Sequence, residues 1–254
     1  MKIKASSLIL ALGLFAFGLV ACNPKKDEGT SNSVTAQGDN SENQETPTLP
    51  DSDADDVTDA QRHAGYQYYG IGKNQTLTFD MTRPDSEGKP ATSEGKQSVI
   101  YQGKVDGVPT YKFEREGALA DMGTDTVVLK DDGVFLLESQ FGKFDSPVIA
   151  LPSEMTVGKN WASSQTVKGP TGEDVNIELN NKIVREEKLT TPAGEFDTMV
   201  VTSTGTIKMA DKSQPVTGTV WYAKGVGSVK LEIKATDAAT GKPTVTTVVL
   251  KSME

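Results

Sequence analysis

The stretch Val-Ile-Tyr-Gln-Gly-Lys-Val-Asp-Gly-Val-Pro-Thr-Tyr-Lys-Phe, residues 99–113, decides the fold. Asp106-Gly107 separates the runs Val99–Val105 and Val108–Phe113, which are rich in β-branched and aromatic residues. Asp-Gly between two such runs is the strongest short-range signal for a β-hairpin, because both turn residues tolerate a positive φ. The stretch therefore predicts two antiparallel strands joined by a tight turn.

The same strand-and-turn pattern continues from residue 63 to residue 254. Leu77, Phe79 and Met81 alternate with polar residues, which predicts a strand with one apolar face. Further short runs separated by Gly, Pro, Asp and Asn predict strands over 126–129, 134–138, 175–179, 182–189, 196–209, 216–222, 228–234 and 245–250. About eleven strands with little or no helix predict an all-β antiparallel meander that forms a sandwich, a barrel or a strongly curved half-barrel.

The N-terminus predicts a cleaved export signal over residues 1–21. Lys2 and Lys4 precede an apolar run from Leu8 to Ala21. This run has about 14 residues, whereas a helix that spans a membrane needs roughly 20. A short apolar run behind a basic start, with small residues near its end, is typical of a signal peptide.

The end of this leader, Leu19-Val20-Ala21-Cys22, contains the only cysteine in the chain. It resembles the lipobox of bacterial lipoproteins. The resemblance implies that Cys22 is acylated, becomes the mature N-terminus and holds the protein on a membrane. Two or more acyl chains anchor a protein stably, whereas one chain holds it only marginally.

The residues directly after the cysteine indicate to which membrane the protein is delivered. Enterobacterial lipoproteins that stay in the inner membrane carry Asp after the cysteine, and here Asn23 follows Cys22. The resemblance thus implies the outer membrane, in a host that has one. The segment Asn23–Glu28 also resembles the charged segments that direct surface export in some Gram-negative bacteria, although a charged linker would begin in the same way.

Residues 22–62 predict a disordered acidic tether behind the lipidated cysteine. The segment after Cys22 has no aromatic residue, and acidic residues outnumber basic ones. Such a composition cannot bury enough surface to offset the entropy of ordering the chain. The whole chain has a formal net charge of −9, which argues against a nucleic-acid partner because phosphate binding depends on clustered Lys and Arg.

A second resemblance covers roughly Leu151–Leu250. Its motifs are Leu151-Pro152 with Val157–Trp161, the turn Thr191–Phe196, and Trp221–Lys230. They are similar to a series in uncharacterised secreted and lipidated bacterial β domains, which have been likened to the half-barrel lipoprotein carriers. Those carriers close the barrel mouth with helices that this sequence lacks, so the resemblance implies architecture more than lipid carriage.

Aromatic residues are the candidate ligand contacts. Trp161, Trp221 and Tyr222, together with the cluster Tyr66-Tyr68-Tyr69, would form the wall of an apolar or sugar-binding groove. The alternative is that these rings fill the core, since aromatic residues make up only 6% of the chain and packing needs them.

The sequence offers no recognisable catalytic set. The only histidine, His63, lies where tether and domain meet, and Cys22 is committed to lipid. A structural zinc would need several His or Cys ligands, so we expect neither metal nor cofactor. Scattered carboxylates leave a two-carboxylate carbohydrate-active enzyme open; they are Glu114, Glu116, Asp125, Glu138, Glu186, Glu187 and Glu232.

The sequence thus favours a non-catalytic lipoprotein of the bacterial cell envelope, anchored through acyl chains on Cys22. Its β domain would bind a protein, glycan or lipid partner, or have another envelope role. A carrier of an apolar ligand in the concave face of the sheet is the first alternative, and the two-carboxylate enzyme is the second.

Overall fold

The structure, a computed structural model, describes residues 56–85, 87–139, 142–168, 173–209, 212–236, 241 and 243–254. The predicted signal peptide, Cys22 and the tether up to residue 55 lie outside these residues. Within the described part of the chain, no helix is long and apolar enough to cross a membrane.

The predicted all-β class is confirmed. The first six strands are β1 (Gln75–Pro84), β2 (Pro90–Val105), β3 (Val108–Gly117), β4 (Asp125–Lys130), β5 (Gly133–Ser139) and β6 (Gly142–Pro152). The other six are β7 (Asn160–Lys168), β8 (Asp174–Thr191), β9 (Gly194–Met209), β10 (Lys212–Ala223), β11 (Gly227–Thr236) and β12 (Pro243–Met253). Two short helices accompany them, α1 (Ala64–Tyr69) and the 3₁₀ helix η1 (Ala120–Met122).

Two of these strands, β6 and β7, do not correspond to any run that the sequence analysis separated. In β7, Ser163 and Gln165 occupy buried positions where an apolar residue would mark a strand, and β6 is interrupted by Asp145 and Pro147. Conversely, β8 is one continuous strand through both predicted runs, 175–179 and 182–189. Polar residues on the buried face thus concealed β7, and the interruption of the apolar pattern at Asp145 and Pro147 concealed β6.

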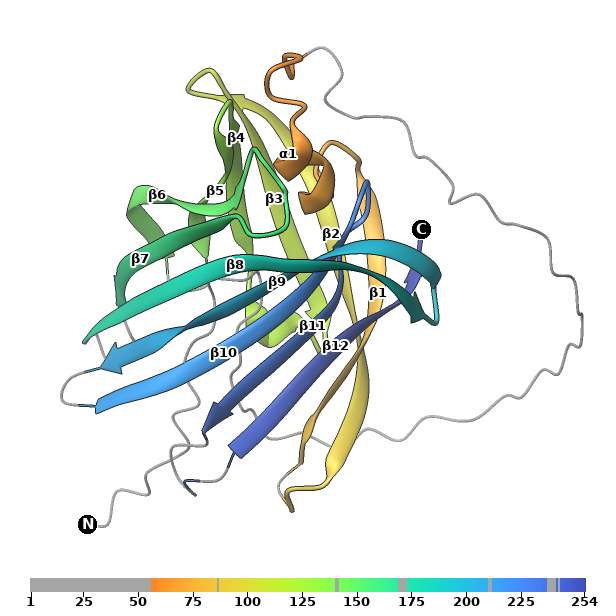
Figure 1. Ribbon diagram of the computed structural model, residues 1–254, viewed down its shortest axis with the longest axis vertical. Coiled ribbons are helices and arrows are strands. Elements are labelled where there is room, and N and C mark those ends of the chain that lie inside the picture. The colour runs from red at the N-terminus through yellow and green to blue at the C-terminus, as the bar shows by residue number, and fades with distance from the viewer. Residues whose placement is uncertain are drawn as a thin grey trace, which may run out of the picture.

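All twelve strands join one sheet in the order β6-β5-β4-β3-β2-β1-β12-β11-β10-β9-β8-β7, and neighbouring strands are antiparallel. Only the pair β1–β12 joins strands distant in sequence. The sheet is strongly curved, so that its two edge strands, β6 and β7, come close to each other (Figure 1). Its edges, β6 and β7, are consecutive in the chain.

The hairpin that the sequence predicted is present. Val105 pairs with Val108 across Asp106 and Gly107, whose φ values are 52° and 80°. The predicted turn after residue 191 is confirmed as well, because Thr191 pairs with Gly194. Both turns set strand registers that place the apolar residues on one face.

The concave side of the sheet holds the hydrophobic core. Leu77, Phe79 and Met81, which alternate in β1, are all buried. Buried apolar side chains from all twelve strands and from α1 form a single cluster. Its largest fully buried members include Tyr111, Phe79, Met122 and Ile183.

The short helix α1 holds the two halves of the sheet together at one end (Figure 1). It contacts β5 and β6 on one side and β10 and β11 on the other. His63 caps it, because its Nδ1 accepts a hydrogen bond from the Tyr66 amide at 3.1 Å. Gly70 ends it with φ 72°, and a Cβ there would lie 2.3 Å from the Val226 carbonyl oxygen. Only glycine fits at this contact.

Residues 56–62, which the sequence assigns to the tether, contact the domain. Val57 is buried in the core. The Tyr101 hydroxyl donates a hydrogen bond to Asp56 Oδ2 at 2.8 Å. Within the described residues, contacts with the domain therefore include Asp56 and Val57, because Val57 supplies apolar surface that the local composition does not reveal.

Candidate functional site

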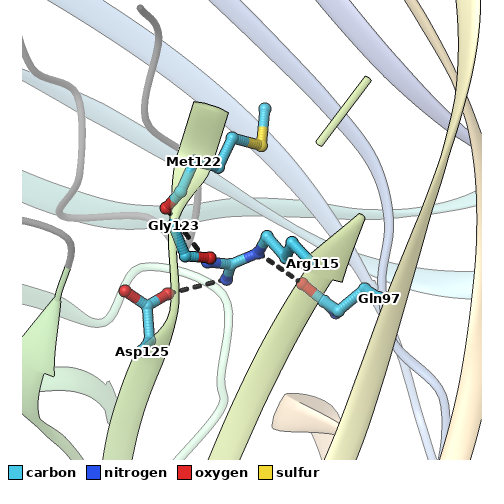
Figure 2. A network of polar contacts seen from close by, with 5 residues as sticks. All are labelled: Gln97, Arg115, Met122, Gly123 and Asp125. Atoms are coloured by element: carbon cyan, nitrogen blue, oxygen red, sulfur yellow. Dashed lines mark hydrogen bonds and ion pairs between the residues drawn. The ribbon is translucent and has the colours of Figure 1, made fainter. Parts of the chain in front are cut away.

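The interior of the sheet contains a buried arginine on β3. Arg115 continues the inward-facing series Tyr111 and Phe113, and its side chain has 0% exposure. Figure 2 shows its guanidinium surrounded by oxygen acceptors. Nη2 donates to Asp125 Oδ2 at 2.6 Å and Nε donates to Gln97 Oε1 at 3.0 Å. Nη1 donates to the backbone oxygens of Met122 and Gly123 at 3.3 and 3.1 Å.

These contacts join three strands and one turn. Gln97 lies on β2, Arg115 on β3 and Asp125 on β4, while Met122 and Gly123 belong to the η1 turn between β3 and β4. A buried charge is tolerated only when it is paired and its remaining donors are bonded. Because every nitrogen of the guanidinium has an acceptor, we interpret this network as a structural clamp on the η1 turn.

Burial has the largest effect on the pKa values of the ionisable side chains around this clamp. It raises the pKa of the Asp125 carboxyl above its ordinary value, and the adjacent Arg115 opposes that rise. Burial also raises the pKa of the Tyr69 hydroxyl, and the charge of Asp125 adds to the effect. The Tyr69 ring packs edge-on against Phe113 with centroids 5.5 Å apart. The region therefore favours neutral side chains apart from the Arg115–Asp125 pair.

A second buried polar group lies on the inner faces of β7, β8 and β9. Asn181 Nδ2 donates to Ser163 Oγ at 3.0 Å, and Ser163 Oγ donates to the Ile149 carbonyl oxygen of β6 at 3.2 Å. The second of these hydrogen bonds joins β7 to β6, the two edge strands of the sheet. The described residues of β6 and β7 are not joined by a ladder of backbone hydrogen bonds.

Several polar atoms of this group have no partner among the described residues. They are Trp161 Nε1, both amide atoms of Gln165, Asn181 Oδ1 and Ser203 Oγ. Asn181 and Ser203 are each 2% exposed, and Gln165 is 9% exposed. Leaving a buried polar atom unpaired costs about 1–3 kcal/mol, so native proteins normally satisfy such atoms with protein groups, water or a ligand.

The aromatic residues predicted as ligand contacts lie in three different surroundings. Trp161 is half-buried on the edge strand β7 and packs against the core. Trp221 donates from Nε1 to Glu187 Oε1, and Lys230 Nζ lies 4.5 Å from the centroid of its ring. Tyr222 is buried close to Tyr69, and burial raises the pKa of its hydroxyl. The three side chains therefore do not line one groove.

The tyrosine cluster belongs to α1, a helix too short for its periodicity to show in the sequence. Tyr66 and Tyr69 are buried, whereas Tyr68 is half-buried. Burial raises the pKa of the Tyr68 hydroxyl, and Glu186 and Asp197 add to the rise. Tyr66 and Tyr69 thus attach the helix to the core.

Among the candidate carboxylates, Glu114, Asp125, Glu187 and Glu232 are each paired with a different cation. Lys112 Nζ lies 2.6 Å from Glu114 and Lys234 Nζ lies 3.0 Å from Glu232. Arg185 and Trp221 together hold the pKa of Glu187 below its ordinary value. No group of three or more potential metal-ligating His, Cys, Asp or Glu side chains occurs among the described residues.

His63 has both ring nitrogens occupied. Nδ1 accepts from the Tyr66 amide, so the ring proton resides on Nε2, which donates to the Lys130 carbonyl oxygen at 2.9 Å. The histidine therefore joins the start of α1 to the end of β4. Sequence reasoning gave it no structural role, because its partner Lys130 is 67 residues away.

Comparison with known proteins finds a family model that matches part of this chain. Residues 142–235, from β6 to the end of β11, match the DUF3108-like family. This match overlaps the second resemblance predicted from the sequence. No curated protein matches the chain.

Three solved structures match the chain at low sequence identity. One, from Bacteroides fragilis, is described as an exported protein with a YmcC-like fold; identity is 14%, coverage is 74% of this chain and 98% of that one, and the TM-score is 0.48. A second, from Parabacteroides distasonis, is described as a lipoprotein; identity is 14%, coverage is 71% of this chain and 95% of that one, and the TM-score is 0.47. The hypothetical lipoprotein YmcC from Escherichia coli has 9% identity, coverage of 75% and 90%, and a TM-score of 0.35.

Proposed function

We propose that this protein is a lipoprotein of the bacterial cell envelope, held on a membrane by acyl chains on Cys22, and that its β domain is a non-catalytic binding module. The leader and the lipobox-like stretch Leu19–Cys22 support the anchor. The acidic segment between Cys22 and the domain supports presentation at a distance from the lipid, because like charges extend a flexible chain.

The observation that carries the non-catalytic assignment is the state of His63. General-base catalysis needs a side chain that can accept a proton from a reacting group. In the chain's only histidine, one ring nitrogen already accepts a backbone amide and the other donates to a backbone carbonyl. Using His63 as a base would require α1 to detach from β4.

The buried Asp125 supports the same assignment. A two-carboxylate glycosidase needs two carboxyl groups that face one cleft, about 5–10 Å apart. Asp125 is instead bound by Arg115 inside the core, with 3% of its side chain exposed. Glu114 and Glu232 are half-buried and are paired with lysines of their own strands.

The packing of the interior favours a binding module over a carrier of an apolar ligand. A carrier needs concave apolar surface that its own side chains leave free. Here apolar side chains from all twelve strands meet in one cluster, and Tyr111, Phe79 and Leu77 within it have at most 1% exposure. An apolar ligand would have to displace this core.

Membrane fractionation of the full chain in a lipoprotein-processing host tests the anchor. We expect the protein to pellet with membranes and Cys22→Ala to move it to the soluble fraction. Ser31→Ala, outside the lipobox, is the matched control and should still pellet. A Cys22→Ala variant that remains membrane-bound would contradict the proposal, and turnover in a hydrolase substrate screen would contradict its non-catalytic part.

A further inference from the structure

We propose that the inner face of β7–β9, behind the seam between β6 and β7, binds a neutral saccharide unit. This inference deepens the proposed function by naming a ligand class, and it rests on that function only in treating the domain as a binding module. The residues concerned are Trp161, Ser163, Gln165, Asn181, Ser203 and Gly218.

The seam is the place where the sheet can open with least loss of hydrogen bonds. Every other pair of neighbouring strands is joined by a backbone ladder, whereas β6 and β7 are the two free edges. Between their described residues, the hydrogen bond from Ser163 Oγ to the Ile149 carbonyl oxygen crosses this seam. Local opening is easiest where few hydrogen bonds must break.

The polar atoms behind the seam form a row across four strands. Trp161 pairs with Asn181, Asn181 with Ser203, and Ser203 with Gly218. The first three residues each contribute one buried atom without a partner among the described residues. Gln165, farther along the inner face of β7, adds a donor and an acceptor. The row thus offers both donors and acceptors to a ligand.

The row ends beside a glycine that has room for at least a methyl group. The atom nearest to a Cβ built on Gly218 would be the Glu232 carbonyl oxygen, at 4.0 Å, so the Cβ would meet no clash. Gly218 is buried and takes no positive φ, so backbone conformation does not require glycine there. By contrast, a Cβ on Gly205 in the adjacent strand would collide with the Glu178 carbonyl oxygen at 1.9 Å.

The chemistry of the row selects the ligand class. No buried position of β7, and none from Val175 to Ile183 in β8, carries a charged residue, so a charged ligand would be buried without a counter-ion. An apolar ligand would leave the amide and hydroxyl groups unpaired. A sugar ring has several hydroxyl groups that both donate and accept, and its apolar face can stack on an indole such as that of Trp161.

Titration of the full chain in detergent, followed by amide NMR, tests the inference. The probes are the methyl glycosides of glucose, galactose and N-acetylglucosamine, with methyl glucuronide as the charged counterpart. We expect saturable shifts in β7–β9 at millimolar concentration for at least one neutral probe, and binding of the glucuronide at least tenfold weaker.

Two variants locate the site. Asn181→Leu replaces the amide by an apolar side chain of similar shape, and Gly218→Val fills the space beside Ser203. Each should weaken binding at least tenfold while the circular dichroism spectrum stays unchanged. Ser228→Ala is the matched control, because Ser228 Oγ is also buried without a partner among the described residues but lies on β11; this variant should bind normally.

Absence of shifts with all neutral probes, equal binding of the glucuronide, normal binding by folded Asn181→Leu, or a co-purified lipid at this face would each overturn the inference. Loss of the saccharide site would leave membrane anchorage at Cys22 intact. Hydrolysis of a glycoside during the titration would contradict the non-catalytic function instead, so the two failures are distinguishable.

Discussion

Arg115 Nη2 lies 2.6 Å from Asp125 Oδ2, and both side chains are almost completely shielded from solvent. Removing one member of such a pair leaves an uncompensated buried charge, which typically destabilises a protein by about 3–5 kcal/mol. We expect Arg115→Met to lower the free energy of unfolding by this amount in urea denaturation. The double variant Arg115→Met/Asp125→Leu should recover much of the loss, because neither charge is then buried.

The pair Arg83–Asp121 provides the matched control. Its atoms are 3.2 Å apart, but its side chains are 36% and 27% exposed. Partly exposed ion pairs contribute about 0–1 kcal/mol, so Arg83→Met should have a small effect. Equal losses in Arg115→Met and Arg83→Met would contradict the role assigned to the buried clamp.

His63→Ala should loosen α1. It removes a helix N-cap and the hydrogen bond to the Lys130 carbonyl oxygen, each worth about 1 kcal/mol, so the expected loss in unfolding free energy is about 2 kcal/mol. His63→Asn should lose only about half as much, because asparagine also caps helices but is too short to reach β4. Faster hydrogen exchange at the Tyr66 amide would be the local signature. Equal unfolding free energies for the wild type, His63→Ala and His63→Asn would contradict the role of His63 as the N-cap of α1.

Two glycines on adjacent strands should respond oppositely to alanine. In Gly205→Ala the Cβ would meet the Glu178 backbone, and such overpacking typically costs about 1–3 kcal/mol or more. Gly218→Ala meets no atom closer than 4.0 Å and should be neutral, or stabilising by up to about 1 kcal/mol through reduced entropy of the unfolded chain. Thermal unfolding of both variants measures the difference. A destabilised Gly218→Ala would show that the interior there is full.

Buried tyrosines should limit stability in alkali. Burial raises the pKa of Tyr222 well above the ordinary 10.0, so the folded state favours the neutral hydroxyl. The stabilisation this provides is fully present below about pH 10 and is lost as pH rises towards the folded-state pKa, at about 1.4 kcal/mol per pH unit. Tyr222→Phe should therefore lose stability less steeply than the wild type above pH 10.

The matched variant for this measurement is Tyr68→Phe. Tyr68 is half-buried and its pKa is also raised, so its replacement should change the slope less. Urea denaturation at a series of alkaline pH values gives both slopes. Identical slopes for Tyr222→Phe and the wild type would contradict the burial of the Tyr222 hydroxyl in solution.

The sequence predicted strands with an uninterrupted apolar alternation and missed β7, whose inner face is partly polar, and β6, which Asp145 and Pro147 interrupt. Leu77, Phe79 and Met81 identify β1 by alternation alone. Ser163 and Gln165 in β7 occupy the same kind of position, yet their polarity makes them resemble a loop. The strand that contributes most to the candidate saccharide site was therefore the hardest to recognise.

The candidate site shows the same limit. Trp161 was singled out as an aromatic residue, but nothing local indicated that Asn181 and Ser203 would lie beside it. Arg115 could have been found, because a charged residue that continues the inward series of Tyr111 and Phe113 signals a buried pair. Its partners Gln97 and Asp125 could not, since they lie on other strands.

The sequence by itself determined the β class, the turn at Asp106-Gly107 and the predicted acylation of Cys22, because each depends on residues adjacent in the chain. Only the tertiary structure decided which residues meet: His63 with Lys130, Arg115 with Asp125, Trp161 with Asn181, and Asn181 with Ser203. It also decided that β6 and β7 are the edges of the sheet. These relationships depend on strand register and on the curvature of the whole sheet, to which distant residues contribute together.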